Sequence, residues 1–374
     1  MTPNKIIIAP DSFKGTLTSR QIADIISEEA RAAFPACEII KMPVADGGEG
    51  SVETILAATG GEMYETQVLS PDDRLIGASY GIAANGAAII EMAQSSGITR
   101  QKNLNPMTST TYGFGQLILA ALEHGATEFN LCIGGSATTD GGCGMAAALG
   151  VRFSDNKGNQ FIPSGGTLKE ITRIDTGGIE KRIQNSKFTV MCDVDNPLFG
   201  TNGAAYVYSP QKGANPEQVL ALDEGLRHYG ALLFECFGRD FASVPGAGAA
   251  GGLGAGCMAY LNANLMSGID AILKICDFEK QLSNADLIIT GEGKLDSQSL
   301  QGKVLSGILR DAKGVPVLSI CGILECDKEL LDKHDLKVFE TREGTTIGES
   351  MSKPAEYLKI AARKAMQYVR EKER

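Results

Sequence analysis

Residues 5–26 read KIIIAPDSFKGTLTSRQIADII, and this stretch decides the fold class. Residues 5–10 form an apolar run without the alternation of a half-exposed strand, which predicts a strand covered on both faces in a parallel sheet. Thr18 and Gln21 have the spacing of a capping box, and isoleucines recur after them at helical intervals. The chain therefore starts as strand, turn and helix, the repeating unit of α/β folds.

The same order returns along the chain. A strand is expected over 38–44, a turn at DGGEG (46–50) and a helix over 51–58 closed by Gly60. The middle differs, because Asn85-Gly86 predicts a tight hairpin of the primed type and residues 156–158 predict a second hairpin. Near the C-terminus, strands over 286–290 and 315–320 with a helix over 300–312 restore the parallel pattern.

We therefore expect two α/β domains. An open, doubly wound, Rossmann-like parallel-sheet domain is discontinuous, from residues 1–65 and 255–374, and an inserted mixed α/β domain covers residues 66–254. Ligands of open α/β sheets bind beyond the carboxyl ends of the strands. The active site is expected in the cleft between the two domains.

Composition excludes several function classes. The formal net charge of -10 and the lack of a basic stripe argue against nucleic acid as a partner. The first residues do not resemble a signal peptide and no apolar run approaches the ~20 residues of a membrane span, so we expect a cytoplasmic protein without a membrane partner. Nine cysteines without a CxxC pair predict reduced, mostly buried thiols.

Glycine-rich loops after predicted strands carry the chemistry. GGSATTDGGCG (residues 134–144) offers closely spaced N–H groups, the hydroxyls of Ser136, Thr138 and Thr139, and the carboxylate of Asp140, which together suit a phosphate group. The alternative is a tight turn whose glycines only allow close packing of helix and strand.

Two further loops add cations. GEGKLDSQSLQG (residues 291–302) places Lys294 and Asp296 where a lysine could bind phosphate and a carboxylate could bind Mg²⁺. PDSFKGTLTS (residues 10–19) places Lys14 on the first strand-to-helix turn, although a solvated lysine is the alternative there. Arg74 in PDDRL is a further candidate cation.

Acidic residues also stand at predicted strand ends. Asp46 lies in DGGEG and Asp193 in CDVDNPLFG (residues 192–200). Exposed acids at strand ends are common, so each is weak evidence alone. We expect Asp46 to orient the substrate, and Asp193 or Asp296 to bind metal or accept the proton of the acceptor hydroxyl.

Other motifs are weaker. Gly246, Gly248 and Gly251 satisfy GxGxxG with Asp270 downstream, but the preceding DFASVP is a poor strand, which argues against a dinucleotide fold. Three histidines away from the glycine loops argue against histidine acid–base chemistry and a His-rich zinc site. Phosphoryl transfer fits better, since it mainly requires positioning and charge stabilisation.

In several motifs the sequence resembles the type 1 glycerate kinases of bacteria: APDSFKGTLTS, MPVADGGEGS, EMAQSSG, IGGSATTDGG, CDVDNPLFG, GAAGGLGA and ITGEGKLDSQSLQGK. The resemblance implies a two-domain α/β kinase unrelated to P-loop enzymes, with ATP as co-substrate, Mg²⁺ as metal and D-glycerate as substrate. It favours 2-phosphoglycerate as the product.

The site residues are our own inference, made motif by motif. We expect Lys14, Asp193 and Asp296 to be catalytic, with Asp193 and Asp296 also binding the metal. The residues expected to bind substrate or phosphate are Asp46, Gly47, Gly48, Arg74, Ser136, Thr138, Thr139, Asp140, Gly291, Glu292, Gly293 and Lys294.

Two alternatives remain at this point. A non-catalytic regulatory protein that binds a phosphorylated metabolite could use the same loops, and an NAD-dependent 2-hydroxy-acid dehydrogenase would need residues 246–251 to hold NAD. A homodimer is a further expectation that no motif tests.

Overall fold

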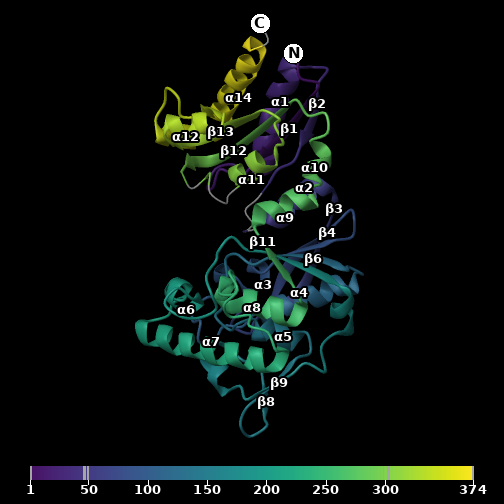
Figure 1. The fold of residues 1–374 in the computed structure, drawn as a ribbon, viewed down its shortest axis with the longest axis vertical. Helices are drawn as coiled ribbons and strands as arrows, with labels where there is room; N and C mark the ends of the chain where they lie inside the picture. The colour runs from purple at the N-terminus through teal and green to yellow at the C-terminus, as the bar shows by residue number, and fades with distance from the viewer. Residues whose placement is uncertain (1, 45–47, 49, 298, 301–303, 373–374) are drawn as a thin grey trace. The chain divides into compact units, whose positions relative to one another are not determined.

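The computed structural model describes residues 2–44, 48, 50–297, 299–300 and 304–372. The chain divides into two compact units, and the helices and strands of both are labelled in Figure 1, where the colour follows the residue number. Unit 1 contains Met1–Asp46, Glu53–Gly60 and Ile269–Arg374, and unit 2 contains Gly47–Val52 and Gly61–Gly268.

Unit 1 is built on five parallel strands in the order β14-β13-β12-β1-β2. The chain leaves β1 toward one edge of the sheet and leaves β12 toward the other, so the strand order reverses between these two neighbours. The expected parallel, doubly wound arrangement is confirmed. The strands are β1 (Lys5–Pro10), β2 (Glu38–Lys41), β12 (Leu287–Asp296), β13 (Val317–Glu325) and β14 (Lys337–Glu340).

The predicted first helix is α1 (Ser19–Ala33), and its capping box is present: the Thr18 hydroxyl accepts from the N–H of Gln21, whose side chain accepts from the N–H of Thr18. α1 packs with α14 (Pro354–Glu371) over a core that includes Ile6 and Ile8. The other helices are α2 (Ser51–Thr59), α9 (Gly268–Ile275), α10 (Phe278–Gln281), α11 (Val304–Asp311), α12 (Lys328–Lys333) and α13 (Ile347–Ser352).

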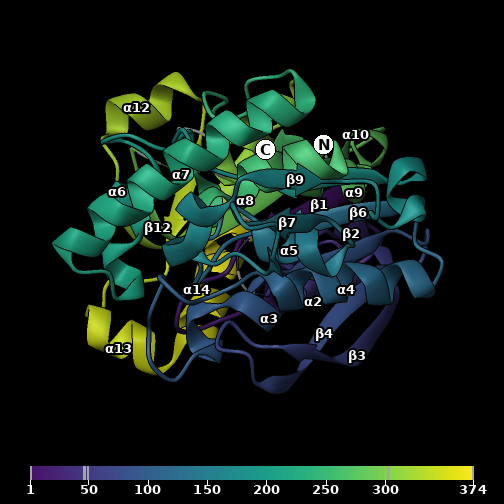
Figure 2. The same cartoon turned by 90° about the horizontal axis from the view of Figure 1, so that it is seen from below.

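Unit 2 contains a mixed sheet in the order β11-β10-β6-β5-β4-β3. The first four strands pair in parallel, and β4 pairs antiparallel with both β5 and β3, so β4 alone runs in the opposite direction. A short antiparallel sheet, β8-β7-β9, is formed by the segment between β6 and β10. Figure 1 labels β8 and β9, and Figure 2 labels β7 and β9. The strands are β3 (Gly61–Leu69), β4 (Leu75–Ala83), β5 (Ala88–Glu91), β6 (Glu128–Cys132), β7 (Arg152–Ser154), β8 (Gln160–Phe161), β9 (Arg173–Asp175), β10 (Lys187–Met191) and β11 (Asn264–Met266).

One extended apolar core joins the helices of unit 2 to its sheet. The longest helix, α7 (Pro216–Phe237), begins at Asn215 in a complete capping box and ends at Gly238 in the left-handed conformation. The other helices are α3 (Ala93–Ser96), η1 (Ile98–Arg100), α4 (Tyr112–Glu123), α5 (Cys143–Ala148), η2 (Gly165–Glu170), η3 (Lys181–Asn185), α6 (Ala204–Tyr208), η4 (Pro210–Lys212) and α8 (Ala249–Leu261).

The hairpin predicted at Asn85-Gly86 joins β4 to β5, but its turn is not of the primed type. Gly86 has φ +86°, whereas Asn85 is not among the residues with positive φ. Both primed types require positive φ at the first central position, which is Asn85 here. The N–H of Ala83 donates to the carbonyl of Ala87 and the N–H of Gly86 to that of Ala83. Three loop residues therefore connect the strands, with glycine at the left-handed position.

None of the nine cysteines, all of which the structure describes, forms a disulfide bond, and five of them are buried, which agrees with the expectation of reduced cysteines. Among the described residues, no helix is both long and apolar enough to span a membrane.

The α7 cap gives a test of stability. Replacing Asn215 by Ala removes the side-chain acceptor for the N–H of Gln218, so we expect the free energy of unfolding to fall by about 1 kcal/mol. Urea denaturation followed by circular dichroism measures the change. The exposed loop variant Asn103→Ala is the control, and an equal loss in both variants would contradict a specific capping contribution.

Candidate active site

The carboxyl edge of the unit 1 sheet brings two predicted motifs together. β1 and β12 are neighbours with Pro10 opposite Gly291, and the N–H of Asp11 donates to the Gly291 carbonyl at 2.8 Å. This is the point where the strand order reverses, the usual ligand position in an open α/β sheet. The motifs around Lys14 and Lys294 therefore follow adjacent strands, although about 280 residues separate them.

Lys14 lies at the exposed tip of a turn with buried anchors. Phe13 and Leu17 are 6% and 8% exposed, belong to the unit 1 core, and pair through backbone hydrogen bonds. Gly15 has φ +82°, a left-handed conformation that glycine adopts without strain. The anchors fix the turn, and Lys14 itself is an exposed residue.

Gly293 allows the Lys14 turn to approach β12. A Cβ atom at Gly293 would lie 3.3 Å from the Cα of Phe13 and 3.5 Å from the nitrogen of Lys14. Any larger side chain would push the turn away from the strand. The glycine thus serves close backbone approach, one of the roles expected for glycines in these loops.

β12 is longer than predicted. Gly291, Glu292 and Lys294, which the sequence assigned to a loop, are strand residues because β13 is also long and pairs with β12 as far as Asp296 and Glu325. β1 ends opposite Gly291. The two strands therefore continue roughly 16 Å beyond the end of β1, at about 3.3 Å per residue.

Lys294 forms ion pairs on this extension. Its Nζ atom lies 2.7 Å from the Glu325 carboxylate and 3.6 Å from that of Asp296. The hydrogen bond and charge of Glu325, followed by the smaller effect of Asp296, raise the pKa of the Lys294 amine. Lys294 therefore stays charged, and Glu325 is a partner that the sequence analysis missed.

Ser299 connects the acidic residues of the same edge. It is 1% exposed, its hydroxyl donates to Glu292 at 2.9 Å, and its N–H donates to the Asp296 carboxylate at 3.3 Å. These bonds fix the carboxylate of Asp296 at the end of β12.

In unit 2 the loop after β6 is only partly accessible. Gly134 and Gly135 are exposed and Ser136 is 6% exposed, whereas Thr138 and Thr139 are fully buried. The two threonine hydroxyls have no hydrogen-bond partner within the described chain. Only the first residues of the loop can meet a ligand in this conformation, so phosphate binding by the two threonines stays a prediction.

Asp140 is also fully buried and organises the loop. Its carboxylate accepts hydrogen bonds from the N–H and hydroxyl of Thr111 and from the N–H groups of Gly142 and Gly144, at 2.8–3.2 Å. Burial raises the pKa of the Asp140 carboxyl, and the four hydrogen bonds offset part of that rise. These contacts are typical of a carboxylate that shapes a loop, and its expected role in binding phosphate stays a prediction.

The GxGxxG segment packs against this loop. Gly251 accepts a hydrogen bond from the N–H of Gly141 at 3.0 Å, and a Cβ atom at Gly251 would lie 2.0 Å from the Thr138 carbonyl oxygen. Gly246 and Gly248 are buried as well. The glycines allow α8 to contact the loop and no strand ends directly before them, so the context of a dinucleotide site is missing.

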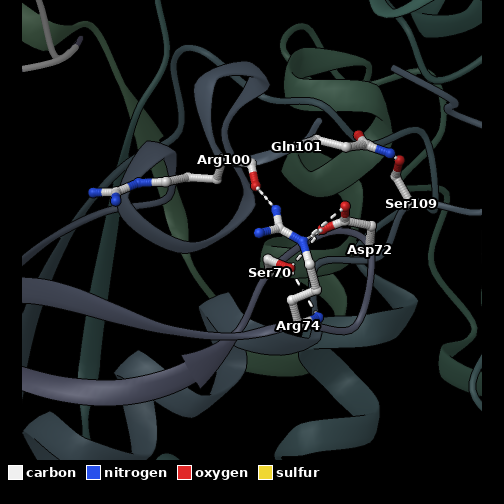
Figure 3. A network of polar contacts seen from close by, with 6 residues as sticks. All are labelled: Ser70, Asp72, Arg74, Arg100, Gln101 and Ser109. Carbon is white, nitrogen blue, oxygen red and sulfur yellow. Dashed lines mark hydrogen bonds and ion pairs between the residues drawn. The ribbon is translucent and has the colours of Figure 1, made fainter. Parts of the chain in front are cut away.

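Arg74 is engaged within the protein, as Figure 3 shows. Its Nε atom donates to both oxygens of Asp72 and one Nη atom donates to the Arg100 carbonyl at 2.7 Å. Burial acts to raise the pKa of the Asp72 carboxyl, but hydrogen bonds from Arg74 and Ser70 outweigh it and leave the pKa lowered. Arg74 therefore joins the β3–β4 turn to η1.

Arg100 is a cation that the sequence analysis missed. Its guanidinium donates to Gln94 at 2.7 Å and, in Figure 3, extends away from the Arg74 side chain. The helix η1 lies against the accessible part of the β6 loop, because the N–H of Ile98 donates to the Gly135 carbonyl at 3.0 Å. The motif EMAQSSG (residues 91–97) contains Gln94, the hydrogen-bond partner of Arg100. It was the sequence signal available for this site, although it was quoted only for its resemblance.

Lys212 is the second missed cation. It is 2% exposed, and its Nζ atom donates to the Ser136 hydroxyl and the Thr138 carbonyl, both at 2.6 Å. Burial lowers the pKa of this amine to about 7, although the charge of Asp140 acts in the opposite direction. The motif SPQKG does not follow a predicted strand, so nothing in the sequence marked this lysine.

Of the remaining predicted residues, Asp193 and Gly48 are described by the structure and two others are not. Asp193 is exposed, and its carboxylate accepts from the N–H of Gly268 at 2.8 Å, at the start of α9. Gly48 is half-buried, while Asp46 and Gly47 lie outside the described residues.

The carboxylates of the candidate site do not form a preformed cluster of metal ligands. Within the described ranges, no three His, Cys, Asp or Glu side chains gather as metal ligands. Mg²⁺ that is bound with a nucleotide needs only one or two carboxylates, since phosphate oxygens and water supply the other ligands. The hard oxygen donors of Asp296 and Asp193 therefore fit this metal.

Comparisons with known proteins agree with one another. A family model described as the Glycerate kinase family matches residues 6–370. The chain is 42% identical over 366 residues to a glycerate kinase of Bacillus subtilis, which covers 96% of each protein. It is 43% identical over 337 residues to the glycerate 2-kinase of Escherichia coli, covering 89% of this chain and 88% of that protein. A crystal structure from Salmonella typhimurium LT2 matches with a TM-score of 0.89 and 36% identity over 99% of both chains.

The role of Asp140 can be separated from direct binding. Asp140→Asn replaces one acceptor oxygen by an NH₂ group that faces N–H donors, so we expect the free energy of unfolding to fall by about 2–4 kcal/mol. Thermal and urea denaturation measure the loss. Asp195→Asn, at an exposed acid, is the control. Normal stability combined with a large rise in KM would instead indicate direct ligand binding by Asp140.

Proposed function

Because the chain belongs to the glycerate kinase family and is a glycerate kinase, we propose that it transfers the γ-phosphoryl group of ATP to the 2-hydroxyl of D-glycerate. The observation that carries the choice of hydroxyl is the 43% identity to a protein named glycerate 2-kinase. The buried, strand-free setting of residues 246–251 argues against the dehydrogenase alternative.

Lys14 and Lys294 are the proposed cations for the phosphoryl groups. Both stand at the carboxyl edge of the unit 1 sheet, Lys14 on a turn fixed by Phe13 and Leu17 and Lys294 between two carboxylates. The Lys294 side chain is 50% exposed, so its amine can bind a phosphoryl oxygen while it keeps its two carboxylate partners. Gly291, Glu292 and Gly293 shape the strand between the two lysines.

Asp193 and Asp296 are the proposed catalytic carboxylates. One accepts the proton of the attacking hydroxyl as the bond from its oxygen to the γ-phosphorus forms and the bond from that phosphorus to the β–γ bridging oxygen breaks, which releases ADP. The other would hold Mg²⁺ through an oxygen ligand. When bound, Mg²⁺ would neutralise charge on the phosphate oxygens. The hydrogen bonds from Ser299 to Asp296 and from Gly268 to Asp193 keep each carboxylate in one orientation.

In unit 2 the accessible start of the β6 loop is the proposed anion site. Gly134, Gly135 and Ser136 offer N–H groups and one hydroxyl, and Arg100 stands on the neighbouring helix η1. Asp140 shapes the loop, with Thr138 and Thr139 buried beside it. Asp46, Gly47 and Gly48 are the residues proposed to orient glycerate. Arg74 fixes η1 through its hydrogen bond to the Arg100 carbonyl.

We also propose that the enzyme acts in the cytosol. A homodimer remains an expectation, for which gel filtration with light scattering is the direct measurement.

The lysine roles are tested by turnover. Lys14→Ala and Lys294→Ala should each lower kcat/KM at least about tenfold, roughly 1.4 kcal/mol of transition-state stabilisation, in an assay coupled to ADP release. Asp193→Asn and Asp296→Asn should do the same. Lys157→Ala, on an exposed hairpin, is the matched control. Near-normal turnover in all four folded variants would refute this placement of the site.

The choice of hydroxyl is tested by the product. Coupling the reaction to enolase, which accepts only 2-phosphoglycerate, should give phosphoenolpyruvate in proportion to the ADP released. ADP release without enolase-dependent product would place the phosphoryl group on the 3-hydroxyl and correct the proposal.

A further inference from the structure

Lys212 is a buried cation for which the proposed reaction gives no role. It comes from η4, between α6 and α7, and is 2% exposed. No carboxylate of the described chain lies within ion-pair distance of its amine. Burying an ammonium group without such a partner costs stability, and replacing it with an apolar side chain is often neutral or stabilising. Stability alone therefore does not explain this lysine.

The amine contacts the β6 loop where the loop becomes accessible. Nζ donates to the Ser136 hydroxyl and to the Thr138 carbonyl, both at 2.6 Å. A hydroxyl has one proton and accepts through its lone pairs. Because Ser136 accepts from Lys212, its own proton remains available for a second acceptor.

The backbone around Ser136 is fixed on both sides. The N–H of Ile98 donates to the Gly135 carbonyl, and the N–H of Ala137 donates to the Ser96 carbonyl. The N–H groups of Gly134, Gly135 and Ser136 donate to no other residue that the structure describes. The donors at this part of the loop are therefore the N–H groups of the exposed Gly134 and Gly135, together with the N–H and the hydroxyl proton of Ser136, which is 6% exposed and follows them directly.

We propose that Lys212 is a positioning residue, which holds the Ser136 hydroxyl so that its proton points to an anionic oxygen of the substrate bound at residues 134–136. The inference rests on the proposed function, because it assumes that an anionic group binds there. That group is either a phosphate of ATP or the carboxylate of glycerate. In both cases the ammonium also adds positive charge beneath the site, where low polarity strengthens its effect.

The charge of Lys212 should depend on pH in the working range. Burial lowers the pKa of the amine to about 7, and Asp140 is the charged group of the described chain that acts against this shift. The ordinary value is 10.5, so between pH 7 and 10.5 the unfolded state binds more protons than the folded state. The free energy of unfolding of the wild type should therefore rise with pH relative to a variant that lacks the amine.

Lys212→Met keeps the length of the side chain and removes the charge and the donors. We expect it to lower kcat/KM about tenfold at pH 6.5, and the ratio of wild type to variant to shrink at least about threefold by pH 9, as the wild-type amine loses its proton. The KM values distinguish the sources: a rise confined to KM for ATP indicates a phosphate at the loop, and a rise confined to KM for glycerate indicates the carboxylate. Lys157→Met is the control.

Ser136→Ala completes the test and remains informative if Lys212→Met does not fold. Since both residues act through one hydroxyl, Ser136→Ala should lower kcat/KM about tenfold and the double variant should lose little more. Unchanged kcat/KM in folded Lys212→Met or in Ser136→Ala, or a ratio that is constant with pH, would overturn the inference. The proposed function fails separately, if the wild type itself does not release ADP from ATP in the presence of glycerate.

Discussion

The buried carboxylate of Asp140 is the interaction on which unit 2 depends. It gathers four donors from Thr111, Gly142 and Gly144, which ties the loop after β6 to the start of α4 and to its own following helix, α5. A charge at 0% exposure is tolerated only when its hydrogen bonds are satisfied, so these donors must occupy these positions. The backbone of the loop is thereby fixed before any ligand is bound.

The other features of the loop follow from this constraint. Gly251 must be glycine because α8 approaches to the distance of backbone contact, and the N–H of Gly141 finds its acceptor there. Lys212 donates hydrogen bonds to two further oxygens of the loop, the Ser136 hydroxyl and the Thr138 carbonyl. Residues 137–144 are buried, whereas Gly134 and Gly135 are exposed and Ser136, at 6% exposure, stands at the boundary between them. In unit 1 a glycine has the matching role, since Gly293 admits the turn that carries Lys14.

Local signals in the sequence predicted where several helices and strands begin. Thr18 and Gln21 are a capping signal contained within four residues, and α1 begins directly after Thr18, as they predict. The pair Asn85-Gly86 predicted the hairpin but not its turn, because the number of loop residues depends on the register of two strands. The extension of β12 to Asp296 was missed for a similar reason: it exists through pairing with β13, a contact between distant segments. Thr138, Asp140 and Lys212 are buried, but they stand in irregular segments, where burial leaves no periodic pattern in the sequence. The sequence therefore identified the loop and not the direction of its side chains.

Hydrogen–deuterium exchange with and without a non-hydrolysable ATP analogue, Mg²⁺ and glycerate tests most directly that the carboxyl-edge loops of both sheets bind the substrates. The account predicts new protection of backbone amides in residues 11–17, 134–136 and 291–296. Unit 1 also has a hollow of about 610 Å³ at the opposite, amino ends of β12, β13 and β14, lined in part by Pro316, Leu336 and Tyr368. Protection confined to that hollow or to residues 246–252, with the three carboxyl-edge segments unchanged, would contradict the account.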